Sequence, residues 1–152
     1  MKKFLLAALA AWVVGSQALA EVAPEWKEID VNGDGTLETV ATTNLSDIAF
    51  NQKGELVGWY EKLWKGTNYA GNYNGKPSIL QNGVLSGTIP LTGAVQAEKP
   101  QTSIEKTADG GAFLTGVFKY TQGGVRVSKR YVINSRRLTV QLEVQASGTP
   151  SY

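Results

Sequence analysis

Apolar and polar side chains alternate most clearly near the end of the chain. In Leu138–Ala146, apolar residues occupy every second position, with Thr, Gln and Glu between them. Successive side chains of a strand point to opposite faces, so this pattern predicts a strand with one buried face. Val125–Asn134 shows the same alternation, except that Lys129 interrupts its apolar face. Both segments are predicted to be strands.

Glycine-rich turns divide the sequence that leads up to these two strands. Residues 122–124 (Gln-Gly-Gly) follow a predicted strand at Ala112–Thr121, and residues 109–111 (Asp-Gly-Gly) follow a weaker one at Thr102–Ala108. Glycine adopts the positive φ angles that tight hairpins require. The segment 102–146 therefore predicts a four-stranded antiparallel meander.

The first half of the chain shows the same organisation less regularly. Residues 51–54 form a predicted turn between strands at Leu45–Phe50 and Glu55–Trp64, and residues 65–77 read as a loop. A short strand is expected at Val84–Ile89, and Gln96–Gln101 is interpreted as a polar connector. Since no helix is expected beyond residue 20, the fold class is all-β, an antiparallel β-sandwich.

The first twenty residues have the organisation of an export signal. Lys2 and Lys3 precede an apolar run, Phe4–Val14, and Ala18–Ala20 matches an A-x-A cleavage site. The run is short for a membrane span of about 20 apolar residues, which favours a cleaved signal peptide over a signal anchor. In either case, the chain after Ala20 is predicted to lie outside the cytoplasm.

Composition excludes several classes of function. Cysteine and histidine are absent, which removes His-based catalytic triads and zinc sites built from these residues. Without Lys2 and Lys3 the charge is close to neutral, so no nucleic-acid partner is expected. Glu55 and Glu61 would lie about 20 Å apart along a strand, too far for a glycosidase pair. We therefore expect no enzymatic activity.

The most specific local motif is the segment DVNGDGTLE, which begins at Asp30. Oxygen-bearing side chains at alternate positions around a Gly suit Ca²⁺, which takes several oxygen ligands from a tight loop. The predicted ligands of a structural calcium ion are Asp30, Asn32, Asp34, Thr36 (through its carbonyl) and Glu38. The segment departs from an EF-hand because Ala41 occupies the twelfth position. A hairpin turn without metal remains the alternative.

Aromatic residues gather between residues 59 and 73. The predicted ligand-binding side chains are Trp59, Trp64, Tyr69 and Tyr73. They could form a sugar- or peptide-stacking surface, or they could fill the core and hold the loop in place. Trp59 and Tyr60 are adjacent in a predicted strand, so at most one of them points into the core.

Two segments together carry a family resemblance. Thr42–Trp64 gives a strand, an Asn-x-x-Gly turn and a strand that opens with Glu-Leu-Val, and Val117–Gln145 gives an aromatic-x-Tyr strand, a Gly turn, a Lys-x-Tyr strand and an alternating strand. This order resembles the large periplasmic domain of the YidC membrane protein insertases, over residues 42–146. The resemblance implies a β-supersandwich related to the galactose mutarotase fold.

The resemblance also implies a role and partners. YidC-like proteins insert and fold inner-membrane proteins, alone or with the Sec translocon, so Sec components and nascent membrane proteins are the expected partners. The family's insertase activity resides in five transmembrane helices that this sequence does not contain, so no insertase residue is carried over. Its first hydrophobic segment is generally an uncleaved anchor, whereas Ala18–Ala20 favours cleavage, and the Asp30 loop is outside its pattern.

These observations define the expected organisation. Residues 1–20 are expected to be a signal peptide or signal anchor, and residues 21–41 an N-terminal segment with the calcium-type loop. Residues 42–152 are expected to be a periplasmic β domain, which the abrupt end after a strong strand suggests is truncated. We expect a non-catalytic scaffold at the periplasmic side of the inner membrane, with edge strands that contact a partner. An exported, calcium-stabilised carbohydrate-binding module, periplasmic or secreted, is the alternative.

Overall fold

A computed structural model describes residues 23–61, 67–68, 90–137 and 139–150. These residues form strands joined by turns and loops, and none of them is helical. The strands are β1 (Glu25–Ile29), β2 (Glu38–Thr42), β3 (Ser46–Phe50), β4 (Leu56–Glu61), β5 (Thr67–Asn68), β6 (Val95–Ala97), β7 (Gln101–Lys106), β8 (Ala112–Gln122), β9 (Val125–Asn134) and β10 (Val140–Gly148).

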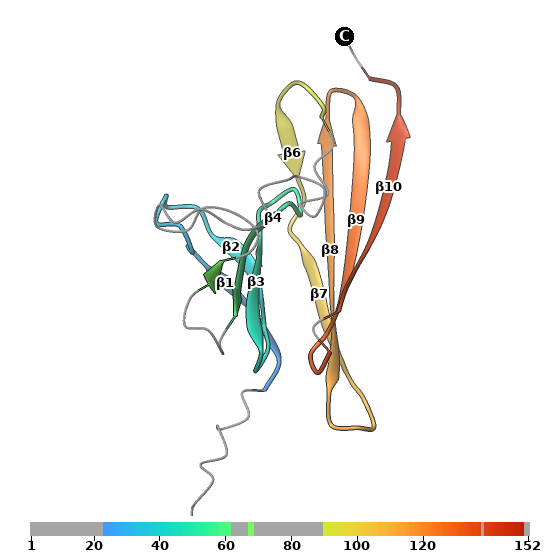
Figure 1. Cartoon of the computed structure of the whole chain (residues 1–152). Helices are drawn as coiled ribbons and strands as arrows, with labels where there is room; N and C mark the ends of the chain where they lie inside the picture. The colour runs from blue at the N-terminus through green and yellow to red at the C-terminus, as the bar shows by residue number, and fades with distance from the viewer. Residues whose placement is uncertain (1–22, 62–66, 69–89, 138, 151–152) are drawn as a thin grey trace, which may run out of the picture.

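The strands form two antiparallel sheets. The first has the order β1-β2-β3-β4-β5, so each strand pairs with its neighbour in the sequence. The second has the order β10-β9-β8, and both β6 and β7 pair along the other edge of β8. Figure 1 shows the two sheets as separate layers, with the long strands β8, β9 and β10 in one of them. The predicted antiparallel β-sandwich is confirmed.

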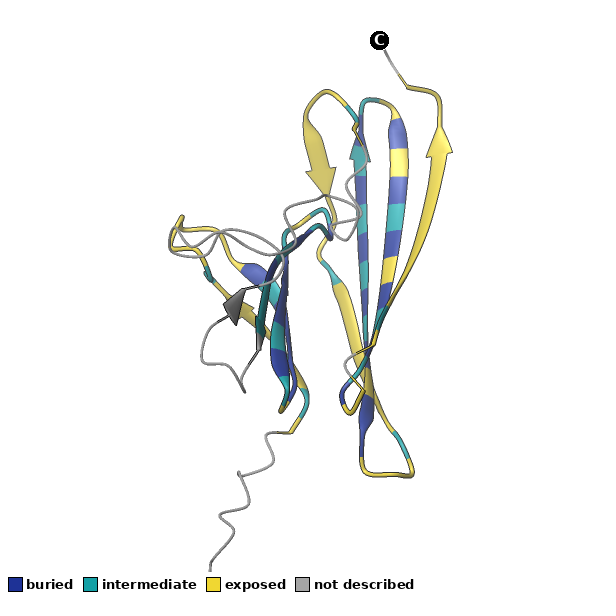
Figure 2. Cartoon of the chain, viewed as in Figure 1, coloured by how far each residue is buried: buried dark blue, intermediate teal, exposed yellow. Residues whose placement is uncertain are grey.

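One hydrophobic core joins the two layers. Phe50 of β3 is fully buried, and its ring centroid lies 4.4 Å from that of Tyr131 and 5.3 Å from that of Phe118 in the second sheet. Along β8 and β9, buried residues alternate with more exposed ones, as the bands in Figure 2 show. The alternation in the sequence therefore marks the face that packs against the first sheet.

The predicted meander is confirmed as β7, β8, β9 and β10. The turn between β8 and β9 consists of Gly123 and Gly124, whose φ angles are 56° and 79°. Two consecutive positive φ angles are typical of the two-residue hairpin turn that matches strand twist. A Cβ atom at Gly123 would lie 2.6 Å from the carbonyl oxygen of Thr92, so a side chain there is also sterically excluded.

The turn that precedes β4 also has the predicted form. The side chain of Asn51 accepts hydrogen bonds from the backbone amides of Lys53 and Glu55, both at 2.9 Å. Gly54 closes the turn with a φ of 65°, and its added Cβ would lie 2.7 Å from the Phe118 side chain. This hairpin is therefore packed directly against the second sheet.

Two segments differ from the expectations. Gln96–Gln101 is not simply a connector, because Val95–Ala97 forms β6 and Gln101 begins β7. Polar composition concealed β6, whose three side chains are exposed, and the start of β7, which begins one residue before the predicted Thr102. The expected loop at 65–77, apart from 67–68, and the expected strand Val84–Ile89 lie outside the described residues, as does the leader 1–20.

The N-terminal segment belongs to the first sheet. β1 pairs with β2 from Glu25 opposite Thr42 to Ile29 opposite Glu38, and the expected boundary between residues 41 and 42 lies inside β2. Trp26 packs against the core, with its ring centroid 6.3 Å from that of Phe50. The calcium-type loop therefore joins two paired strands of the sandwich.

Candidate functional site

The carboxylate of Asp30 organises the loop between β1 and β2. Its Oδ1 accepts hydrogen bonds from the backbone amides of Gly33 and Asp34, at 2.7 and 3.2 Å, and its Oδ2 accepts one from Gly35 at 2.9 Å. Gly33 and Gly35 have φ angles of 75° and 87°. Glycine permits these angles without steric cost, which allows the three amides to converge on one carboxylate.

The next two predicted ligands each accept a hydrogen bond from the backbone amide two residues further along the chain. Asn32 Oδ1 accepts a hydrogen bond from the amide of Asp34 at 2.9 Å, and Asp34 Oδ1 accepts one from the amide of Thr36 at 2.7 Å. The hydrogen bond from the Thr36 backbone lowers the pKa of the Asp34 carboxyl. Both acidic side chains of the exposed loop thus bind backbone amides.

Glu38 occupies a different position from the other predicted ligands. It begins β2 and is buried, and its Oε2 accepts a hydrogen bond from the amide of Val31 at 2.9 Å. In the described ranges, no group of three or more Asp, Glu, His or Cys side chains is placed to hold a metal ion. The loop has the amide-braced carboxylates of a calcium-type turn, and calcium binding by it stays a prediction.

The structure describes only one of the four aromatic residues predicted to bind ligands. Trp59 of β4 is half-buried and packs against the core, opposite Ile48 of β3. Of the two roles that the sequence allowed, ligand stacking or core packing, Trp59 thus has the second. Trp64, Tyr69 and Tyr73 lie outside the described residues, so a stacking surface stays a prediction.

Strand β10 is the most exposed of the long strands. It pairs with β9 along its whole length, and no described residue pairs with its other edge. Leu142 lies opposite Tyr131 and Val144 opposite Lys129, which places both on the face that carries the core. Their exposed fractions are nevertheless 37% and 43%. β10 thus combines an open edge with an incompletely covered apolar face.

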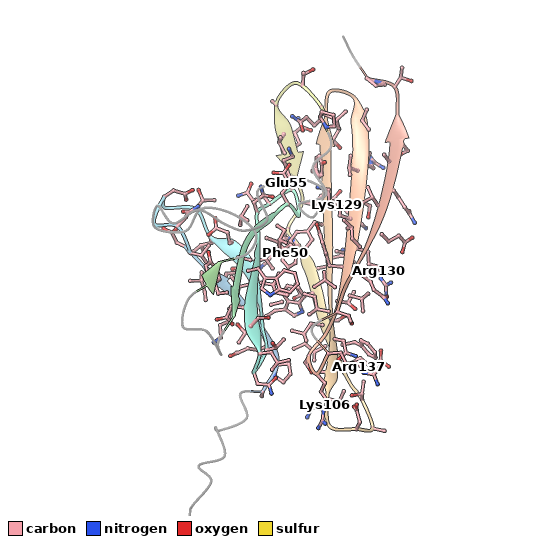
Figure 3. The ribbon with its side chains drawn as sticks, viewed as in Figure 1. Phe50, Glu55, Lys106, Lys129, Arg130 and Arg137 are labelled. Atoms are coloured by element: carbon pink, nitrogen blue, oxygen red, sulfur yellow. The ribbon has the colours of Figure 1, made fainter. Side chains whose placement is uncertain are left out.

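Lys129 is the charged residue that interrupts the apolar face of the strand Val125–Asn134 in the sequence, and the structure places it on the buried face of β9. Its side chain is fully buried, and its Nζ has no hydrogen-bond partner among the described residues. Burial lowers its pKa to about 8, although the Glu55 carboxylate acts in the opposite direction. Figure 3 shows Lys129 near Glu55, at one end of the core that contains Phe50.

Glu55 is held by groups other than Lys129. Its carboxylate forms an ion pair with Lys53 at 2.9 Å and accepts a hydrogen bond from the side-chain Nδ2 of Asn51 at 2.7 Å. Partial burial tends to raise the pKa of Glu55, but the hydrogen bonds from Lys53 and Asn51 outweigh this effect and lower it. Glu55 therefore stays ionised and faces the buried ammonium without a direct contact.

Comparison with known proteins gives no further assignment. No protein-family model, no curated protein and no solved structure matches the chain. Over the described part of the chain, no helix has the length and apolar character needed to cross a membrane.

Proposed function

We propose that this chain is the extracytoplasmic β-sandwich part of a YidC-like membrane protein insertase. In this role it is a non-catalytic scaffold that assists insertion and folding of inner-membrane proteins by contacting partners. The proposal is supported by the strand and turn order of residues 42–146, which resembles the periplasmic domain of that family. In this role the leader 1–20 is retained as an anchor, as the first hydrophobic segment of that family generally is, although the Ala18–Ala20 triplet taken alone favours cleavage.

The observation that carries the partner-contact role is the outer edge of β10, with which no described strand pairs. An unpaired edge presents backbone N–H and C=O groups that can pair with a strand from another chain, and natural sheets usually protect such edges. β10 extends over nine residues, and its only charged residue is Glu143. Leu142 and Val144 add an apolar face beside the edge. The candidate contact is therefore a strand that joins β10 and covers these two side chains.

Site-specific photocrosslinking in inner-membrane vesicles tests this role. A photoreactive residue replaces Gln141 or Gln145 of β10 in the full chain, and a matched control replaces Arg130 on the neighbouring strand β9. We expect crosslinks to Sec translocon subunits or to a stalled nascent membrane protein from the β10 positions, at least several-fold stronger than from Arg130. Equal crosslinking from both strands, or none from β10, would contradict the proposal.

The Asp30 loop favours a second candidate, an exported carbohydrate-binding module stabilised by calcium. Its support is the convergence of three backbone amides on Asp30, together with the run of aromatic residues in the sequence between residues 59 and 73. Glycan-array binding that is lost on Trp64→Ala, while the unfolding temperature is unchanged, would favour this module. Binding to no glycan in the presence of calcium would leave the insertase proposal as the better one.

A further inference from the structure

A cavity of about 390 Å³ opens at the end of the sandwich where the described chain begins. Ala23 and Pro24, just before β1, form part of its wall, and Ile104 and Ala112 of the second sheet form another part. The cavity lies beside the turn that joins β7 to β8. It is therefore built from the first described residues and from the near end of the second sheet.

The charged side chains among the described residues that line this cavity are both cations. They are Lys106, at the end of β7, and Arg136, in the turn after β9. Arg137 follows in the same exposed turn, and Figure 3 shows Arg137 and Lys106 at the same end of the molecule. No described carboxylate forms an ion pair with any of the three. We call Lys106, Arg136 and Arg137 the basic end.

Asp109 is the acidic group in the adjacent turn. Its carboxylate accepts hydrogen bonds from the hydroxyl of Thr107 and from the amide of Gly111, at 3.2 Å for the latter. The hydrogen bond from Thr107, the amide of Gly111 and the charge of Arg136 all lower the pKa of Asp109. Asp109 thus offsets part of the charge of Arg136, and the two turns together retain an excess of positive charge.

The position of the leader fixes how far this end can lie from a membrane. Three peptide units separate Ala20, at the end of the leader, from Ala23 in the cavity wall. Three extended residues span at most about 11 Å. This length is close to the distance of about 8–10 Å over which exposed charges interact at ordinary salt. An anchored leader would therefore hold the cavity and the basic end within electrostatic reach of lipid headgroups.

We propose that the basic end binds the phosphate groups of anionic phospholipids in the outer leaflet of the membrane that anchors the chain. This inference rests on the proposed function, since it needs the leader to be retained as an anchor. Lys106 and Arg136 would contact the phosphate, and the apolar wall at Ala23, Pro24 and Ile104 would accept the adjoining glycerol carbons. The contact would orient the sandwich with the end of β8 at Gln122 pointing away from the membrane.

The full chain, reconstituted in vesicles, provides the test because it contains no cysteine. A donor dye is attached at Ala108→Cys, in the exposed turn beside the cavity, or at Ala94→Cys, near the opposite end of β8. Energy transfer to an acceptor lipid is compared in phosphatidylcholine vesicles and in vesicles with 30% phosphatidylglycerol. The charge variant carries Lys106→Gln, Arg136→Gln and Arg137→Gln, and the matched control carries Lys119→Gln, Arg126→Gln and Arg130→Gln.

We expect transfer from position 108, but not from position 94, to increase in phosphatidylglycerol vesicles and to lose this increase in 1 M salt. The ratio of membrane-contacting to free orientations should fall about fivefold for each basic residue removed from the basic end. The control variant should retain the increase. Equal loss in both variants, the same transfer in both kinds of vesicle, or an equal effect of a soluble acidic peptide would overturn the proposal.

Carbonate washing of the same vesicles separates this inference from the proposed function. A chain that stays in the membrane but shows no effect of phosphatidylglycerol contradicts the lipid contact alone. A chain that carbonate removes contradicts the anchored arrangement, and with it the lipid contact that depends on anchoring.

Discussion

The Nζ of Lys129 lies 5.5 Å from the centroid of the Tyr120 ring, inside the sandwich. The same ring has the Nζ of Lys53 at 5.6 Å, and Lys53 also pairs with Glu55. The face of an aromatic ring attracts a cation, but this attraction is smaller than the cost of burying an ammonium without hydrogen bonds. The buried face of β9 therefore contains a charge that the surrounding structure compensates only in part.

Replacing Lys129 by Met should stabilise the protein. Met has a similar length and no charge, so the variant removes the desolvation cost and retains most of the packing. We expect the free energy of unfolding at pH 7 to increase by about 1–3 kcal/mol, measured by denaturant titration. Lys119→Met, at a half-buried position on the other face of the sheet, is the control and should change it by less than about 0.5 kcal/mol. A loss of stability in Lys129→Met would contradict this interpretation.

The same lysine predicts how stability depends on pH. The pKa of Lys129 is about 8 in the folded protein, against 10.5 for an ordinary lysine. Between these values the unfolded chain binds a proton that the folded chain has released, so stability increases as the pH rises above about 8. Burial raises the pKa of Tyr120 and of Tyr131, which lowers stability above about pH 10.

The rise in stability should therefore appear between about pH 8 and pH 10. It is measured as the difference between the wild-type protein and Lys129→Met, because the tyrosine contributions are common to both and cancel. A difference that stays constant over this range would show that Lys129 titrates like an exposed lysine.

Two buried tyrosines should respond differently to loss of their hydroxyl groups. The hydroxyl of Tyr131 donates a hydrogen bond to the carbonyl of Gly54, which connects the second sheet to the turn before β4. Tyr131→Phe leaves that buried carbonyl without this donor and should cost about 1–2 kcal/mol. The hydroxyl of Tyr120 is buried without a hydrogen-bond partner in the described structure, so Tyr120→Phe should be neutral or stabilising. Equal effects in thermal unfolding would contradict the assignment.

The long strands of the second sheet could be predicted because one periodic signal determines them. Along β8 and β9 the buried positions alternate strictly, and even the exception at Lys129 lies on the buried face. The last strand begins at Val140 and ends at Gly148, two residues later than the predicted Leu138–Ala146. Pairing with β9 extends it, because Ser147 and Gly148 still lie opposite Arg126 and Val125.

The strands that composition concealed are short or lie at an edge. β6 has three exposed residues, and its strand conformation comes from pairing with the end of β8 rather than from its own sequence. β1 is largely exposed and polar, and it is held by β2 and by the packing of Trp26 on the core. Local periodicity gives no information about such pairing, which depends on residues distant in the sequence.

The spacing of oxygen-bearing residues predicts the calcium-type loop, but it does not predict which of these residues are buried. From the sequence, Glu38 and Asp30 are equivalent candidate ligands. In the structure, Glu38 is buried at the start of β2, whereas Asp30 accepts hydrogen bonds from the backbone amides of the loop. Glu38 already lies in β2, opposite Ile29 of β1, and its carboxylate accepts the amide hydrogen of Val31. The sequence also could not show that Trp59 belongs to the core, since its neighbour Tyr60 was an equal candidate.

Calcium should stabilise the protein if the Asp30 loop binds it. Extracellular calcium sites of this kind have dissociation constants of about 10⁻⁴–10⁻³ M, so 10 mM calcium should add about 1.4–2.7 kcal/mol to the free energy of unfolding. Asp30→Asn should lose most of this gain, and Asp109→Asn, in another exposed turn, should retain it. An unfolding temperature that is the same in 10 mM calcium and in EDTA would contradict calcium binding.

Both proposals require the sandwich to be held on the extracytoplasmic face of the inner membrane, and accessibility labelling in intact cells measures this directly. Single cysteines at Ala108 and Ala94 are treated with a membrane-impermeant thiol reagent, and the membranes are then washed with carbonate. We expect both positions to be labelled from outside the inner membrane and the labelled chain to remain in the membrane at its full length. Labelling only after the membrane is broken, or recovery of a shortened chain in the soluble fraction, would contradict an anchored extracytoplasmic domain.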